Sequence, residues 1–283
     1  MTGIDTYELV WLVIGLLVAG GITGMLAGLF GVGGGTVAVP ILYELFRYLG
    51  VPEDVRMQLC IGTSLAIIVP TSIRSYYSHK ERGAIDMALL RSWVVPILAG
   101  VIIGSMIARF APADLFKIIF VMVAGFTAIR LLFAKDNWYL GTTYPSKIVV
   151  KLVGAVIGVL ASLMGIGGGQ LSTLFMTFYK RPIHEAVATS AGVGVLISIP
   201  GALGYIFAGW PTAALYPDVA ALQPPLTLGY VSLVGFLLFI PTSIYMAPIG
   251  AKLAHRLSRR KLEMAFGLFL TAICLRFLYS IFF

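Results

Sequence analysis

Long apolar segments follow one another along this chain, with only short polar stretches between them. They fall at about 8–30, 36–49, 57–77, 87–110, 113–134, 147–163, 170–180, 183–208, 226–252 and 262–282. Hydrophobic residues make up 59% and charged residues 11% of the 283 residues, against about 45–50% and about 25% in soluble domains. So few charges exclude soluble enzymes, nucleic-acid-binding proteins and disordered chains. We predict an all-α polytopic membrane protein with about eight to ten transmembrane helices in a lipid bilayer.

The ten segments divide into two similar sets of five. A shift of 134 residues places Gly31 on Gly165, and nine of sixteen positions between 20 and 35 are then identical to their counterparts. Such a match indicates an internal duplication rather than shared hydrophobicity. We predict a first membrane repeat at 1–134, a cytoplasmic linker at 135–146 and a second membrane repeat at 147–283.

The loop charges predict that the two repeats are inverted relative to each other. Five segments per repeat is an odd number, so the second copy must begin on the other side of the membrane. The loop at 75–91 carries Lys80, Arg82 and Arg91, whereas its counterpart at 209–226 contains no Lys or Arg. Because basic residues favour cytoplasmic loops, we place 75–91, 135–147, 180–184 and 252–261 in the cytoplasm and both termini outside. Eight helices, with the short segments as re-entrant hairpins, is the alternative topology.

Each repeat contains a cluster of glycines, at 31–35 and 165–169, that predicts a break in a helix. Each glycine costs about 1 kcal/mol relative to alanine in a helix interior, so we expect a short helix to begin after each cluster. Free amides and the positive helix dipole at such an N-terminus attract anions. The candidate anion site therefore comprises Gly33, Gly34, Gly35, Thr36, Gly167, Gly168, Gly169 and Gln170. Tight turns without a ligand are the alternative interpretation.

Further candidate ligand contacts lie in the segments that follow the short helices. Thr63 and Ser64 recur as Thr189 and Ser190 in the second repeat, and this recurrence favours a role in binding. Hydrogen bonds from these hydroxyls to the preceding helical turn are the alternative. Arg74, near the predicted cytoplasmic end of its helix, is a candidate for attracting anions.

No catalytic or metal-binding pattern accompanies these residues in the sequence. It contains no HExxH motif and no phosphate-loop motif, and Cys60 and Cys274 lie in apolar runs without a CxxC motif. We predict no cofactor, no metal and no enzymatic activity. The expected partners are a small anionic substrate and the lipid bilayer, with no nucleic acid, and the oligomeric state stays open, with a homodimer as one option.

The glycine motif at 28–36 with Pro40, its second copy at 162–170, and the segments 188–190 and 250–254 resemble the TauE/SafE family of sulfite exporters. The resemblance covers essentially the whole chain. It implies a multi-pass protein of the plasma (inner) membrane that exports, or less often takes up, sulfite, sulfoacetate or related organosulfonates. The second short helix lacks a counterpart of Pro40, so the two halves need not be equivalent.

The expected direction of transport follows from the membrane potential. With the cell interior negative, export of one negative charge gains about 2.3 kcal/mol per 100 mV. An exporter of anions therefore needs no coupling ion, and we expect an electrogenic carrier that alternates its access between the two sides. An anion channel, an uptake permease and an integral-membrane enzyme are the alternatives.

Overall fold

The computed structural model describes residues 6–30, 34–133, 139–215, 223–224, 226–254 and 259–282. The helices in these ranges are α1 (Thr6–Phe30), α2 (Gly35–Tyr48), α3 (Glu53–Glu81), α4 (Met87–Phe110), α5 (Ala113–Phe133), α6 (Lys147–Met164), α7 (Gly169–Phe178), α8 (Ile183–Leu215), α10 (Leu233–Ala254) and α11 (Arg259–Phe282). Two strands, β1 (Thr227–Leu228) and β2 (Val231–Ser232), form a small hairpin. The helices begin and end close to the predicted segments.

Within the described residues, seven helices are long and apolar enough to cross a membrane: α3, α4, α5, α6, α8, α10 and α11. In α1 the stretch Val13–Ala27 forms a shorter apolar helix. Large apolar side chains such as Val95, Phe110 and Phe207 are at least 70% exposed, as expected where lipid rather than water surrounds the protein. These features confirm the all-α polytopic membrane fold.

Two helices, α2 and α7, are too short to cross a bilayer. Their 14 and 10 residues extend over about 21 and about 15 Å at about 1.5 Å per residue. The hydrocarbon core of a bilayer is about 30 Å thick. Each of these helices therefore reaches only part of the way through the membrane.

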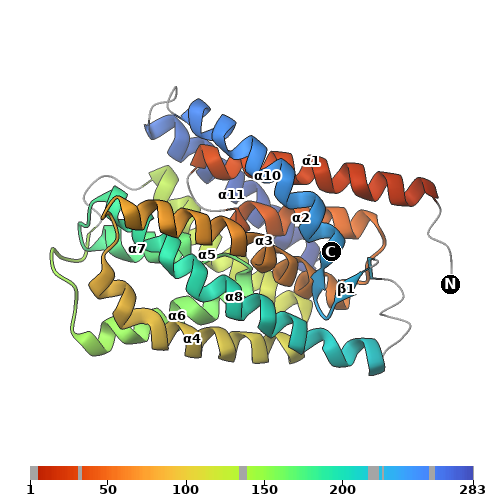
Figure 1. Ribbon diagram of the computed structural model, residues 1–283, viewed down its shortest axis with the longest axis horizontal. Helices are drawn as coiled ribbons and strands as arrows, with labels where there is room; N and C mark the ends of the chain where they lie inside the picture. The colour runs from red at the N-terminus through yellow and green to blue at the C-terminus, as the bar shows by residue number, and fades with distance from the viewer. Residues whose placement is uncertain are drawn as a thin grey trace.

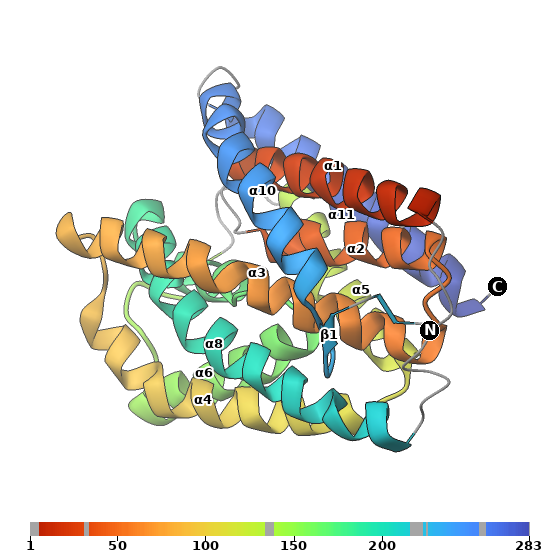
Figure 2. The same ribbon diagram turned by 45° about the vertical axis from the view of Figure 1, so that its right-hand side comes forward.

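The first helix of each predicted repeat packs against the fourth helix of the other repeat. In this way α1 lies along α10, and α6 lies along α4; Figures 1 and 2 show the two pairs on opposite sides of α3 and α8. Glycines permit the close approach: Gly24 lies against the Ser243 backbone, and Gly158 lies against the Ile97 backbone. Such small residues let membrane helices gain van der Waals contact without side chains between them.

The centre of the bundle is formed by α3 and α8, which run in opposite directions. Near one end of this contact the hydroxyls of Ser72 and Ser198 lie 3.3 Å apart. Further along, Leu65 contacts Gly201. These two helices occupy equivalent positions in the predicted repeats, so equivalent segments point in opposite directions.

The helices α5 and α11, which also occupy equivalent positions, are antiparallel as well. At one end of this pair the buried Lys117 ammonium donates to the Glu53 carboxylate and to the Ser280 hydroxyl. At the other end Leu132 lies against Gly267. The ion pair thus joins the starts of α3 and α5, and the hydrogen bond to Ser280 joins them to the end of α11.

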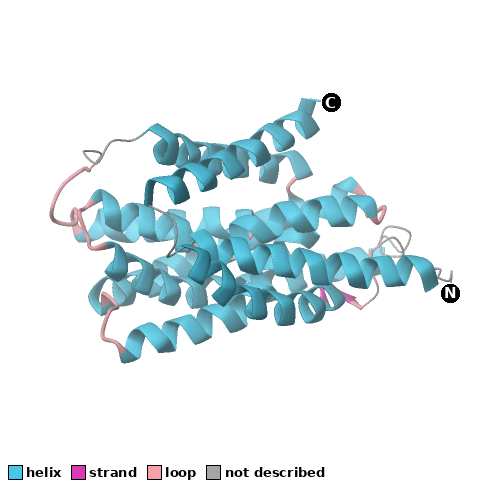
Figure 3. Ribbon diagram, turned by 90° about the horizontal axis from the view of Figure 1, so that it is seen from above, coloured by secondary structure: helices cyan, strands magenta, loops and turns pink. Residues whose placement is uncertain are grey.

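The loops after α3, α5 and α7 meet at one end of the bundle, which we call the linker end. There the Tyr144 hydroxyl donates to Asp86 at 3.3 Å, and the Arg181 guanidinium lies 4.5 Å from the centre of the Tyr144 ring. At the start of α11, Arg260 donates to the Leu131 carbonyl of α5 at 3.0 Å. Loops lie at both ends of the helices in Figure 3, and those of the linker end are the ones that the charge pattern places in the cytoplasm.

The hairpin corrects one expectation from the sequence, because the segment predicted to be helical from 226 begins its helix only at Leu233. Gly229 has a positive φ of 57° and lies directly against the Ile206 backbone of α8. The Tyr230 amide donates to the Tyr205 carbonyl at 3.2 Å. This apolar stretch therefore turns and pairs with α8, which its hydrophobicity alone does not reveal.

We expect Gly158→Ala to destabilise the protein by about 1–3 kcal/mol, because overpacking has this cost in a close-packed interface. The added carbon would lie 2.5 Å from the Ile97 carbonyl oxygen, so α4 and α6 would have to separate. The matched control is Gly125→Ala in α5, where the added carbon meets the Cys274 sulfur at 4.0 Å. Thermal unfolding in detergent compares the two, and equal melting temperatures would contradict the close-contact role of Gly158.

Candidate functional site

The second glycine cluster breaks the chain between α6 and α7, as predicted. Gly165 ends α6 in the left-handed conformation with φ of 66°, and the Ile166 amide donates back to the Ala161 carbonyl at 3.1 Å. Gly168 precedes α7 with φ of 67°. Only glycine adopts this conformation without a steric penalty, so two left-handed residues within four positions account for the break.

The first glycine cluster also lies between two helices, since α1 ends at Phe30 and α2 begins at Gly35. Gly34 accepts the first hydrogen bonds of α2, from the amides of Val37 and Ala38. The candidate residue Gly33 lies outside the described residues. The described part of this cluster thus provides a second short helix with a glycine-rich start.

The two breaks contact each other inside the protein. The Thr36 hydroxyl donates to the Gln170 side-chain oxygen at 3.1 Å. A Cβ on Gly35 would lie 2.6 Å from the Gly165 carbonyl oxygen and 2.8 Å from the Ile166 Cα. We call the described residues 34–36 and 165–170 the glycine junction.

The two short helices run away from the glycine junction in opposite directions. The last turn of α7 leads to Arg181 at the linker end. In contrast, Tyr43 near the end of α2 contacts Ser280 at 3.2 Å, at the opposite end of the bundle. Because neither helix spans the membrane, the junction lies inside the bundle with a helix N-terminus facing it from each side.

Two carbonyl acceptors at the end of α6, beside the junction, are paired with side-chain hydroxyls. The Ser64 hydroxyl donates to the Gly165 carbonyl at 2.8 Å, and the buried Tyr205 hydroxyl donates to the Ser162 carbonyl at 3.0 Å. These carbonyls belong to the end of α6, where helical partners are missing. Side-chain hydroxyls therefore neutralise the negative end of α6.

Donor groups at the start of α7 have no partner within the described part of the chain. The first amide of α7 that bonds within the helix is that of Ser172, which donates to Gly168, so the amides of Gly169, Gln170 and Leu171 precede the hydrogen-bond ladder. The Gln170 side-chain nitrogen is also buried and has no partner among the described residues. An excess of donors with a positive helix dipole makes the junction suited to an oxyanion.

The walls of the junction are apolar and tightly packed. Ile68 of α3 lies close to both Gly35 and Gly167, and Val193 and Ile197 of α8 lie close to Gly168. Thr36 is 1% and Gln170 is 7% exposed, whereas Gly34, Gly167 and Gly169 are half-buried. Apolar side chains therefore enclose Thr36 and Gln170, while the three glycines keep part of their surface exposed.

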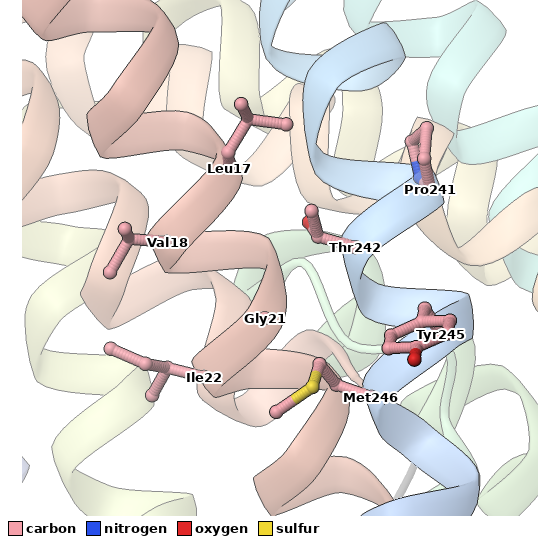
Figure 4. Close-up of a pocket in the computed structure, with 8 residues that line it drawn as sticks. All are labelled: Leu17, Val18, Gly21, Ile22, Pro241, Thr242, Tyr245 and Met246. Carbon is pink, nitrogen blue, oxygen red and sulfur yellow. The ribbon is translucent and has the colours of Figure 1, made fainter.

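Two hollows lie elsewhere on the described surface. One is an apolar groove of about 510 Å³ between α1 and α10, lined by residues such as Val18, Thr242 and Tyr245 (Figure 4). Its apolar lining and exposed position are those of a surface that faces lipid.

The second hollow is a polar cleft of about 670 Å³ at the linker end, between the starts of α4 and α8. Asp86, Arg181, His184 and Glu185 line it. Burial raises the pKa of Tyr144, which lies beside this cleft, and the neighbouring Asp86 carboxylate adds to the increase. Neither hollow is lined by a residue of the glycine junction.

The hydroxyls of Thr63 and Thr189 each accept the backbone amide of the residue that precedes a long helix. The Thr63 hydroxyl accepts the Ser232 amide at 3.0 Å, just before α10, and the Thr189 hydroxyl accepts the Asp86 amide at 2.9 Å, just before α4. The Ser190 hydroxyl donates to the Val187 carbonyl of its own helix. Ser64 is thus the member of these two pairs whose hydroxyl contacts the glycine junction.

Arg74 lies on an exposed face of α3, in contrast to the buried polar groups of the junction. Polar residues that we did not select from the sequence are Thr23, Ser72 and Ser198. Thr23 is fully buried next to Gly34, and its hydroxyl has no partner among the described residues. The spacing that relates Thr63 to Thr189 also relates Ser72 to Ser198, so the repeat itself contained a signal for that pair.

Among the described residues, no group of three or more His, Cys, Asp or Glu side chains is placed to hold a metal ion. The cysteines Cys60 and Cys274 are buried free thiols. The chemistry available at the junction is therefore hydrogen bonding from neutral donors.

Comparison with known proteins agrees with this architecture. The model of the sulfite exporter TauE/SafE family matches residues 16–277. A probable membrane transporter protein of Haemophilus influenzae is 34% identical over 263 residues, covering 92% of this chain and 95% of that protein. Another, of Methanocaldococcus jannaschii, is 28% identical over 260 residues, with 91% and 92% coverage. No solved structure gives a significant match. This chain therefore belongs to the TauE/SafE family of sulfite exporters and is a multi-pass membrane transporter.

Proposed function

We propose that this transporter exports small sulfur oxyanions, sulfite or organosulfonates, across the plasma (inner) membrane, and that the glycine junction binds them. The observation that carries the proposal is the meeting of two helix N-termini, joined by the hydrogen bond between Thr36 and Gln170. The family match and the names of the relatives support transport. The free donors of the junction support an anion as the substrate.

The bound oxyanion would accept hydrogen bonds from several neutral groups at once. On one side are the amides of Gly35 and Thr36, which precede the hydrogen-bond ladder of α2. On the other are the amides of Gly169 and Gln170 together with the free Gln170 side-chain nitrogen. Hydrogen bonds to a charged group contribute about 1.5–3 kcal/mol each, so a few of them offset much of the cost of removing a small anion from water.

Release of the anion requires the junction to open, and the arrangement of the two halves suggests how it opens. We propose that 1–134 and 147–283 are inverted repeats joined by the linker at 135–146. The antiparallel pairs of α3 with α8 and α5 with α11 support this assignment. One repeat rocking against the other would expose the junction first to one side of the membrane and then to the other.

The proposed direction of transport rests on the membrane potential. Outward movement of one negative charge gains about 2.3 kcal/mol per 100 mV when the cell interior is negative. Uptake would oppose the same force and would need a coupled cation or proton. An uncoupled exporter requires only an anion site and alternating access.

We expect Gln170→Leu to reduce the apparent affinity for sulfite by about 10- to 100-fold, since it removes a hydrogen bond to a charged ligand. The measurement is concentration-dependent sulfite efflux from proteoliposomes.

The matched control for this variant is Gln58→Leu. Gln58 is also a buried glutamine with one paired and one unpaired side-chain atom, but its nitrogen donates to the Ala111 carbonyl at the end of α4. Gln58→Leu should retain the wild-type affinity. If the two variants bind sulfite equally well, Gln170 does not contact the substrate.

We expect outward sulfite flux to increase when the potential inside the vesicle is made more negative, because each cycle carries net negative charge outward. Proteoliposomes with potentials set by potassium and valinomycin measure this dependence. Flux that carries no charge and ignores the potential would reject the uncoupled exporter. Saturable flux with trans-stimulation is expected of a carrier, whereas an ohmic, non-saturating conductance would identify a channel.

A further inference from the structure

We propose that the glycine junction selects oxyanions that carry a single negative charge. This inference rests on the proposed function and narrows its substrate class. It favours hydrogen sulfite and simple monosulfonates over the sulfite dianion, sulfate and sulfoacetate. The reasons are the charge, the burial and the donor set of the junction.

Charged residues are kept away from the junction on the helices that surround it. No charged residue occurs in α7, while α6 carries Lys147 and Lys151 within its first two turns, and α8 carries His184 and Glu185 in its first turn. In α3 the charged residues other than Arg74 lie in the end turns, and Arg74 is exposed. Sites for multiply charged oxyanions usually contain Arg or Lys, whose full charges compensate the ligand.

The surroundings of the junction are apolar and raise the cost of burying charge. Ile68, Val193 and Ile197 lie against its glycines, and Thr36 and Gln170 are at least nine-tenths buried. The cost of transferring an ion into such surroundings rises with the square of its charge. A dianion therefore pays about four times the desolvation cost of a monoanion of the same size.

The donors of the junction cannot recover this difference. Amides, the Gln170 side chain and the ends of α2 and α7 are neutral dipoles, and the energy of a charge with a dipole rises only in proportion to the charge. Doubling the ligand charge thus doubles the gain while it quadruples the cost. Neutral dipoles in an apolar enclosure favour the single charge.

Two buried groups indicate that the junction is built for a ligand rather than closed on itself. The Gln170 side-chain nitrogen has no partner among the described residues although the same side chain is held in place by Thr36. The fully buried Thr23 hydroxyl, next to Gly34, also has no partner among them. Buried polar groups are normally paired, and a small oxyanion would supply the missing acceptor.

The experiment measures transport by the full chain in proteoliposomes with methanesulfonate, sulfite, sulfate and sulfoacetate. Methanesulfonate carries one charge at every pH used, sulfate and sulfoacetate carry two near neutrality, and sulfite gains a proton near neutral pH. We expect sulfate and sulfoacetate to move slower than methanesulfonate by about tenfold or more. Sulfite flux should rise as the pH falls through neutrality, because more of the sulfite then carries a single charge. Methanesulfonate flux should stay constant, and it is the control, because titration of the protein itself would change both fluxes.

The ratio of current to sulfur flux gives an independent measurement. Transport of hydrogen sulfite carries one elementary charge per sulfur atom, whereas transport of the sulfite dianion carries two. Two charges per sulfur atom, or sulfate moving as fast as methanesulfonate, would overturn the inference and leave the anion transporter intact. If neither methanesulfonate nor sulfite moves, the proposed function itself fails.

A charge-adding variant tests the same reasoning from the protein side. Gln170→Lys places a cation at the junction and should raise the ratio of sulfate flux to methanesulfonate flux about tenfold. Gln58→Lys, at the end of the bundle, is the matched control and should leave the ratio unchanged. If the ratio of sulfate flux to methanesulfonate flux is the same in both variants and in the wild type, the role of charge at the junction is contradicted. If a variant does not fold, the series of anions measured on the wild-type protein still decides the proposal.

Discussion

The contact between two helix breaks is the feature on which the rest of this structure depends. Gly35 approaches the Gly165 carbonyl so closely that a Cβ would lie 2.6 Å from the oxygen, and only this approach brings Thr36 within hydrogen-bond distance of Gln170. The short lengths of α2 and α7 follow from the same breaks. A side chain at the contact would separate the two helix N-termini and with them the donors that they bring together.

Backbone that leaves a helix inside a membrane must find partners, because lipid supplies none. At the glycine junction this requirement is met unevenly. Hydroxyls of Ser64 and Tyr205 pair with carbonyls at the end of α6, whereas the amides at the start of α7 stay free of the helical ladder. The buried Gln170 side-chain nitrogen adds a further unpaired donor, and among the described residues these donors lie among apolar side chains. These donors are the physical basis on which we propose an anion site and its preference for a single charge.

The Thr-Ser pair that recurs at 63–64 and 189–190 has a structural role that its recurrence alone did not reveal. Thr63 and Thr189 each accept the amide of a residue that precedes a helix, Ser232 or Asp86. Recurrence in both copies suggested ligand binding, but a contact that holds two helices together recurs for the same reason. The member of these Thr-Ser pairs that reaches the junction is Ser64 of α3, whose hydroxyl donates to the Gly165 carbonyl at the end of α6.

Local chemistry determined what the sequence alone could predict. Runs of apolar residues placed α4 at 87–110, and glycine clusters placed the starts of α2 and α7, because helix length, helix breaking and burial in lipid depend on neighbours in the chain. Only the tertiary structure decided that Thr36 meets Gln170, that Ser72 meets Ser198 and that the residues before α10 turn into a hairpin. The two side-chain contacts join residues that are far apart in the chain, and the hairpin is held against α8 by the Tyr230 amide. Such contacts exist only where helix packing brings two backbones together.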